Sequence, residues 1–152
     1  MFKVGTMRHF RTILATITLI ATLSAASLAH CEIPCGIYDD AARFNAMREH
    51  ITTIERSMNQ VNALSESPSE HMNQLVRWVN NKEKHADDFT HIVTWYFQAQ
   101  RIKPDCTDYH RKLELLHRMQ VQAMKCKQTT DLQHVEKLRE LVTEFEAVYG
   151  KK

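Results

Sequence analysis

Apolar residues recur at alternating intervals of three and four along most of this chain, and this spacing constrains its fold more than any other feature. Such a repeat places apolar side chains on one face of an α-helix. Four stretches carry the repeat. Their apolar positions are Phe44, Met47, Ile51, Ile54, Met58 and Val61; Met72, Leu75, Val79, Ala86, Phe89, Val93 and Tyr96; Tyr109, Leu113, Leu116, Met119 and Ala123; and Val135, Leu138, Val142, Phe145 and Tyr149.

Helix start and stop signals separate these stretches. Asp39 is placed to cap the first helix, and residues 67–70 (SPSE) combine a Ser N-cap, a Pro at the first helical position and a Glu three residues past the cap. Residues 103–105 (KPD) end the second helix and open the third, with Lys82 interrupting the second apolar stripe. Thr130 and Gln133 have the spacing of a capping box before the fourth helix.

The pattern predicts an all-α fold. Four amphipathic helices joined by short connections are typical of an antiparallel four-helix bundle, which we expect over residues 39–152. Only three Gly and three Pro occur in the whole chain, and no alternating strand pattern is present. One domain of this size can bury a core of ordinary dimensions.

The N-terminal segment resembles a secretory leader. Residues 1–11 carry three basic residues and no acid, residues 12–24 are apolar or small, and Ser27 and Ala29 stand where signal peptidase prefers small residues. The apolar run is shorter than the roughly 20 residues of a membrane span. We therefore expect residues 1–29 to be a signal peptide that is removed, leaving His30 as the new N-terminus. An uncleaved anchor, an organellar presequence and a lipoprotein remain as alternatives.

Removal of this segment makes the protein nearly neutral. The full chain has 20 Lys+Arg and 18 Asp+Glu, and the leader takes three of the bases and none of the acids. A neutral chain gives no reason to expect nucleic acid as a partner, nor a membrane for the mature form. The leader predicts export to a periplasm or to the medium, or to a lumen if the protein comes from a photosynthetic organelle.

The four cysteines fall into two groups. Cys106 and Cys126 are both expected on the third helix, where 20 residues separate them by roughly 30 Å, so they cannot pair with each other. Each is expected to be free, buried or an intermolecular partner. Cys31 and Cys35 lie in a segment too rich in Pro and Gly for a helix, and a disulfide between them remains open for an exported protein.

The new N-terminus adds donors to this cysteine pair. An α-amino group has a pKa of about 7.7–8 and can therefore bind a metal near neutral pH. The amine of His30, the amide nitrogen and thiolate of Cys31 and the thiolate of Cys35 can form a planar N2S2 set, provided that the amide gives up its proton. The His30 imidazole is then an optional axial ligand. A turn at Pro34 and Gly36 would fold the second thiolate back. Such a set suits nickel(II) or copper(II) rather than tetrahedral zinc.

The remaining histidines show no ligand pattern. His85 and His91 are six residues apart, which is not a same-face helical pair, and no H-E-x-x-H motif is present. Seven histidines are therefore expected mostly on the surface. They are His50, His71, His85, His91, His110, His117 and His134.

Residues 30–38 (HCEIPCGIY) match the H-C-x-x-P-C-G-x-Y nickel hook, and the chain thereby resembles nickel superoxide dismutase. The resemblance covers residues 30–149, including an aromatic run at residues 95–97 (WYF) and Lys103-Pro104 after it. It is specific because six defined residues fall at fixed spacing directly after the expected cleavage site.

The resemblance implies both the site and the reaction. His30, Cys31 and Cys35 would bind one nickel ion per subunit, and Tyr38 and Tyr96 would lie near the open face of the metal. The enzyme would convert superoxide to oxygen and hydrogen peroxide by Ni(II)/Ni(III) cycling. The family also implies a homohexamer of four-helix bundles.

Two departures from the family pattern leave alternatives open. In the family pattern an acid in the first helix and an arginine in the second hold the axial imidazole, whereas the nearest positions here are the uncharged Asn45 and Asn81. Either the tuning of His30 differs, or other residues such as Arg43, Arg48 or Arg77 substitute. One alternative function is an exported nickel- or copper-binding or delivery module without turnover. Another is a small helical interaction protein with a Cys31–Cys35 disulfide.

Overall fold

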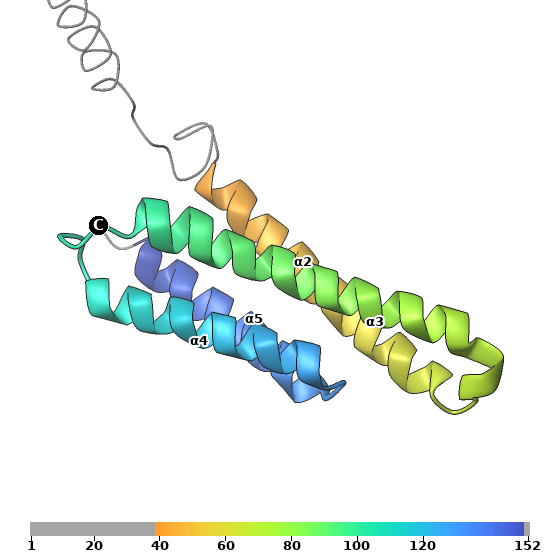
Figure 1. The fold of residues 1–152 in the computed structure, drawn as a ribbon. Coiled ribbons are helices and arrows are strands. Elements are labelled where there is room, and N and C mark those ends of the chain that lie inside the picture. Colours follow the sequence, from red (N-terminus) through yellow and green to blue (C-terminus); the bar gives the residue numbers. More distant parts are fainter. Residues whose placement is uncertain (1–38, 151–152) are drawn as a thin grey trace, which may run out of the picture. The chain divides into compact units, whose positions relative to one another are not determined.

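The computed structural model describes residues 39–150, which form four helices in the expected places (Figure 1). The described helices are α2 (Asp40–Leu64), α3 (Pro68–His91), α4 (Tyr109–Gln128) and α5 (Leu132–Tyr149). A π-helical segment, η1 (Ile92–Arg101), continues α3 without a break. The described part of the chain contains no strand, so the predicted all-α class is confirmed.

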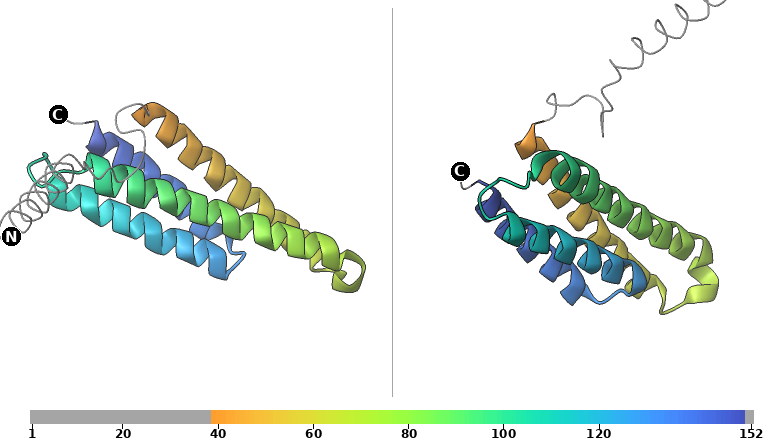
Figure 2. Two further views of the ribbon diagram at one scale, coloured as in Figure 1. Left: turned by 45° about the horizontal axis from the view of Figure 1, so that its top comes forward. Right: turned by 60° about the vertical axis from the view of Figure 1, so that its left-hand side comes forward.

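The helices pack as an antiparallel bundle. Each helix contacts the next in sequence, and α5 returns to contact α2, which closes the ring of four. The two views of Figure 2 show α2 beside α3 and α4 beside α5. No helix among residues 39–150 has the length and apolarity needed to cross a membrane.

The helix ends follow the sequence signals with two corrections. Asp39 caps α2 by accepting a hydrogen bond from the Ala41 amide at 3.0 Å, as predicted. The capping box expected at Ser67 is wrong, because its side chain makes no capping bond, although Pro68 is the first residue of α3. The cap of α5 is Asp131 rather than Thr130, since the Asp131 carboxylate accepts from the Gln133 amide at 2.9 Å.

The core is made of the predicted stripes, with the largest side chains toward the end where α2 begins. Phe97 lies between Phe44 and Phe145, with ring centroids 4.8 and 5.1 Å away. Tyr149 packs edge-on against both Phe44 and Phe97. All three phenylalanines are 3% exposed or less. This aromatic layer gives the bundle a rigid end.

The second stripe is only partly core. Met72 is 58% exposed and Val79 38%, although their spacing predicted burial, whereas Ala86, Phe89 and Val93 are fully buried. Figure 1 shows the reason, since α2 and α3 extend past the turn between α4 and α5. The first turns of α3 therefore have α2 alone to pack against.

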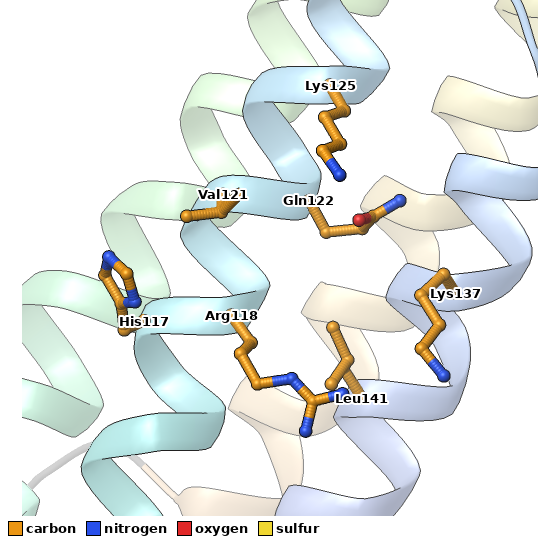
Figure 3. A pocket seen from close by; sticks show the side chains of 7 residues that line it. All are labelled: His117, Arg118, Val121, Gln122, Lys125, Lys137 and Leu141. Carbon is orange, nitrogen blue, oxygen red and sulfur yellow. The ribbon is translucent and has the colours of Figure 1, made fainter.

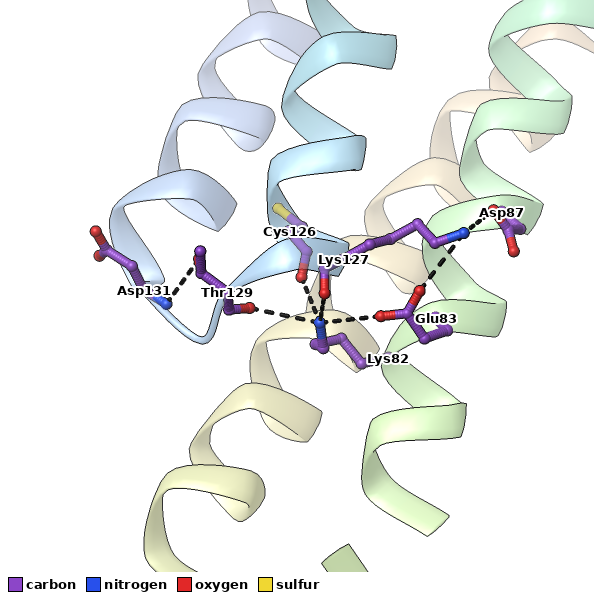
Figure 4. A network of polar contacts seen from close by, with 7 residues as sticks. All are labelled: Lys82, Glu83, Asp87, Cys126, Lys127, Thr129 and Asp131. Atoms are coloured by element: carbon purple, nitrogen blue, oxygen red, sulfur yellow. Dashed lines mark hydrogen bonds and ion pairs between the residues drawn. The ribbon is translucent and has the colours of Figure 1, made fainter. Parts of the chain in front are cut away.

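Lys82, which interrupts that stripe, is buried at 3% exposure in a network of its own (Figure 4). Its ammonium group donates to the backbone carbonyls of Cys126 at 2.8 Å, of Lys127 and of Thr129 at 3.4 Å, and it also contacts Glu83 at 3.2 Å. These carbonyls belong to the C-terminal end of α4, where helical acceptors lack intrahelical donors and attract a cation. Lys82 is thus a cap for a neighbouring helix.

Both described cysteines are free, but one prediction about them is wrong. Cys106 does not lie on the third helix, because α4 begins only at Tyr109 after an irregular connection in which Asp108 adopts φ 56°. Cys126 lies near the end of α4 and is fully buried. Burial raises the pKa of the Cys126 thiol to about 11, so it stays protonated and unreactive at neutral pH.

Candidate metal centre

Four of the five predicted site residues, His30, Cys31, Cys35 and Tyr38, lie outside the described residues. The fifth, Tyr96, lies in η1 and is 2% exposed. The chain passes from Tyr38 directly into Asp39, the cap of α2. The residues around the start of α2 therefore surround the point at which the predicted hook joins the bundle.

Asp40, the first residue of α2, is the centre of a polar cluster at this point. Its Oδ1 accepts a hydrogen bond from the Tyr96 hydroxyl at 2.6 Å, and its Oδ2 accepts one from the Tyr149 hydroxyl at 2.8 Å. Arg101 Nε lies 3.0 Å from the same Oδ1 and forms an ion pair with it. Arg101 Nη2 also donates to the Tyr96 hydroxyl at 2.7 Å. We call Asp40, Tyr96, Arg101 and Tyr149 the Asp40 cluster. It joins α2, η1 and α5 by side chains alone.

Two cations lie over the Tyr96 ring. The guanidinium carbon of Arg101 is 4.8 Å from the ring centroid, and that of Arg43 is 5.9 Å away. Attraction between a guanidinium and an aromatic ring is strongest where water is partly excluded. The Tyr96 ring thus has two guanidinium groups beside it, one of which is paired with Asp40.

Both tyrosines hold their protons firmly. Burial raises the pKa of Tyr96, and its hydrogen bond to Asp40 raises the pKa further. Burial also raises the pKa of Tyr149, again with help from Asp40. The hydrogen bond to Tyr96 raises the pKa of Arg101. At neutral pH the cluster therefore contains two neutral phenols and a charged guanidinium.

Tyr96 is the one member of this cluster that was predicted as a site residue. Tyr149 was expected in the apolar stripe of the fourth helix, and neither Asp40 nor Arg101 was singled out, because the contacts join residues far apart in the chain. Wide π-helical turns are rare and often occur at functional sites. In η1 they accompany the burial of the adjacent Tyr96 and Phe97.

The positions expected to replace the family's acid and arginine do not gather here. Asn45 accepts a hydrogen bond from Arg48 at 3.3 Å on the surface of α2, and Arg48 pairs with Glu146. Asn81 donates to Ser57 at 2.9 Å, between the middle parts of α2 and α3. Arg77 lines a surface hollow beside Asn81. Of the three arginines considered, only Arg43 contacts the cluster.

A separate groove between α4 and α5 has a different character (Figure 3). Its volume is about 290 Å³, and the lining side chains are His117, Arg118, Val121, Gln122, Lys125, Lys137 and Leu141. Figure 3 shows the cationic side chains reaching into the space from both helices. It contains no thiol or carboxylate and thus offers no ligand set comparable with the hook.

The fold and the cluster together define a small four-helix-bundle protein with a polar site where its N-terminal segment meets the helices. A comparison with known protein families matches residues 25–152 to the family described as nickel-containing superoxide dismutase. The chain belongs to this family, so it is an oxidoreductase that acts on superoxide and uses nickel. Comparisons with curated proteins and with solved structures gave no significant match.

The donor chemistry of the chain fits this metal. The matched segment includes two cysteines and a histidine within six residues, directly before the Asp40 cluster. Thiolate sulfur and nitrogen donors in a planar arrangement suit nickel(II). In the cluster itself the carboxylate and the phenols already bind one another, so they are not free to serve as metal ligands.

Proposed function

We propose that His30, Cys31 and Cys35 hold the nickel of this superoxide dismutase, one ion per subunit, at the end of the bundle where α2 begins. When bound there, nickel supplies one-electron chemistry by alternating between Ni(II) and Ni(III), so that one superoxide is oxidised to oxygen and the next is reduced to hydrogen peroxide. Cys35 precedes Asp40 by five residues, and an extended chain spans at most about 3.5 Å per residue. The main support for placing the nickel at this end is that side chains of α2, η1 and α5 meet at Asp40, which is only five residues after Cys35.

The proposed work of the bundle is to shape the access to this centre. Tyr96 and Tyr38 would lie near its open face, where phenolic hydroxyls order water and limit entry to small anions. Tyr96 is held in one position by its bonds to Asp40 and Arg101. Arg43 and Arg101 provide a positive field that attracts the superoxide anion, since clefts lined by one sign of charge concentrate ligands of the other.

We further propose that Asp40 and Arg101 supply the acid and the arginine that the family uses to orient the axial imidazole. They belong to the first helix and to the continuation of the second, the elements that carry these groups in the family pattern. Their ion pair of 3.0 Å is only partly exposed. Asn45 and Asn81 are uncharged and engaged elsewhere.

Maturation and location follow from the same ligand set. The His30 amine exists only after cleavage, so we propose that signal peptidase removes residues 1–29 and that the enzyme is exported to a periplasm, to the medium or to a lumen. We also propose a homohexamer, which the exposed apolar side chains Met72 and Val76 on α3 support, at 58% and 50% exposure. Size measurement in solution tests the assembly.

The first experiment combines intact mass, metal analysis and a superoxide-consumption assay on protein purified from its native host. A chain that begins at His30, with about one nickel per subunit and metal-dependent activity, supports the proposal. Nickel or copper without turnover favours a delivery module. A metal-free chain two daltons lighter than its reduced form favours a disulfide-linked interaction protein. A mature N-terminus other than His30 contradicts both the ligand set and the export route.

A further inference from the structure

A second group of metal-ligating side chains lies between α2 and α3, away from the N-terminal segment. His50 of α2 and His85 of α3 approach with their Nδ1 atoms 2.9 Å apart. Asp88 lies three residues after His85 on the same face of α3. One ligand atom from each of the three lies within 4.8 Å of the other two, and all three residues are half-buried.

A hydrogen bond between His50 and His85 does not by itself account for the arrangement of these side chains. One imidazole must carry its proton on Nδ1 and the other must accept it, while both rings lose contact with water. The rings are tilted by 54° with centroids 5.1 Å apart, so they do not stack. The pKa of His50 is lowered, mainly by burial and also by the charges of His85 and Lys84. The nearby carboxylates of Asp88 and Glu49 raise it, but by less. The lowered pKa of His50 favours its neutral imidazole, whose nitrogen lone pair can bind a metal.

We propose that His50, His85 and Asp88 form a second metal site, for a divalent cation with the ligand preferences of zinc. Two imidazole nitrogens and a carboxylate oxygen are a known three-ligand set for Zn²⁺, with water as the fourth ligand. At Zn–N distances of about 2.0–2.1 Å in a tetrahedron, the two nitrogens would lie about 3.3 Å apart. The observed 2.9 Å needs only a small side-chain rotation to reach that value.

Binding of the cation needs no net loss of a proton from the histidines. The Nδ1 proton that now joins the two rings moves to Nε2 of the same ring, which leaves both Nδ1 atoms free to bind the metal. The ligands come from two helices that pack on each other, so a bound ion would cross-link α2 to α3. The site depends on neither cysteine of the nickel hook.

Lys84 competes with the metal for Asp88. It forms an ion pair with the Asp88 carboxylate, but the lysine side chain is 68% exposed. Exposed pairs of this kind contribute little to stability, so an incoming cation can displace the ammonium group. Removal of the lysine should therefore strengthen metal binding, an effect that adventitious binding elsewhere on the surface would not show.

The test is calorimetric titration of the untagged full chain with Zn²⁺, in a Cys31→Ser/Cys35→Ser background that disables the hook. We expect one Zn²⁺ per chain. His50→Gln and His85→Gln should each weaken binding by at least the roughly 10–100-fold that loss of a supporting residue costs at metal sites. Asp88→Asn should also weaken binding, and Lys84→Gln should strengthen it by a few fold. His71→Gln and Asp87→Asn, on exposed parts of the same helix, serve as matched controls and should leave affinity unchanged.

Thermal melting without metal shows whether each variant remains folded, and melting with Zn²⁺ gives a second readout through the cross-link between α2 and α3. Absence of Zn²⁺ binding in the folded parent overturns the proposal. Binding that survives in the His50→Gln/His85→Gln double variant also overturns it, because the ion would then lie elsewhere. The outcome is independent of the nickel hook, so failure here leaves the proposed superoxide site untouched.

Discussion

Two polar clusters link helices of the bundle, one around the buried Lys82 and one around the partly exposed Asp40, and they are built from different partners. The Lys82 network places one ammonium group among backbone carbonyls at the end of α4. The Asp40 cluster joins one carboxylate to two phenols and a guanidinium, all of them side chains. The first cluster lies where the turn between α4 and α5 meets α3 (Figure 4), and the second joins the first residue of α2 to η1 and to the end of α5.

The difference shows how a small bundle separates stability from function. Backbone carbonyls are present whatever the sequence, so the Lys82 network needs only Lys82 and the neighbouring Glu83 as specified side chains. The Asp40 cluster needs four specified side chains. Besides the carboxylate, these are two phenols and a guanidinium, which are also ionisable groups. Groups of this kind can hold a proton or a charge beside a reacting centre. We therefore expect substitutions in the first cluster to change folding and those in the second to change activity.

The largest effect is expected from the hook itself. Cys35→Ser removes one of two proposed thiolate ligands, so superoxide consumption should fall to the rate of the uncatalysed reaction and nickel content should fall with it. The free energy of unfolding should change by less than about 0.5 kcal/mol, because the described core is built from residues 44–149.

The matched control is Cys106→Ser, a half-buried cysteine in the connection before α4. This variant should keep its nickel and its activity. Full activity in Cys35→Ser, or equal loss in both variants, would contradict the ligand assignment.

Lys82→Met tests the opposite cluster. The substitution keeps the apolar stem and removes the donor from three carbonyls, so the unfolding free energy should fall by about 1–3 kcal/mol. Activity per folded molecule should be retained. Chemical denaturation measures the first quantity, and an assay normalised to folded protein measures the second. Lys137→Met, at a lysine that is 48% exposed in a surface pair with Glu140, should cost less than about 0.5 kcal/mol.

The same contrast explains how far the sequence could predict the molecule. The helices and most of the core follow from local spacing, since a 3.6-residue period and a cap such as Asp39 act within one helix. The hook is likewise a local motif, and the family match includes it. Met72 and Val79 were predicted to be buried and are not, because the lengths of α4 and α5 decide which turns of α3 find a partner.

Contacts between distant residues were beyond a single sequence. Asp40 meets residues 56 and 109 positions later, and His50 meets a residue 35 positions later. Most of the seven histidines were expected on the surface, and the contact between the half-buried His50 and His85 was not foreseen. No spacing rule relates residues on two helices until the packing of those helices is known, so these clusters required the structure.

A smaller effect is expected from Tyr96→Phe, which sharpens the comparison within the Asp40 cluster. The ring packing is kept, while Asp40 loses its shortest hydrogen bond and Arg101 loses an acceptor. Activity should fall by about 5–10-fold, which corresponds to roughly 1–1.4 kcal/mol of transition-state stabilisation. The unfolding free energy should fall by about 1 kcal/mol. Tyr109→Phe, outside the cluster, is the control and should leave both activity and unfolding free energy near the parent values. Unchanged kinetics in Tyr96→Phe would mean that Tyr96 contributes only to packing.

The smallest effect concerns pH. The pKa of Tyr149 is raised in the folded protein, so the phenol contributes stability that is fully present below its unfolded pKa near 10 and is lost as pH rises toward the folded pKa. The folded state binds more protons in that window, and the unfolding free energy must therefore fall with increasing pH. Because Tyr149 is only half-buried, we expect a loss of about 0.5–1 kcal/mol between pH 10 and pH 11 from this residue. In Tyr149→Phe the slope should be shallower by that amount, as measured by urea denaturation across the window. An unchanged slope would mean that Asp40 does not hold the phenol proton, and the cluster would then resemble the Lys82 network more than a site prepared for chemistry.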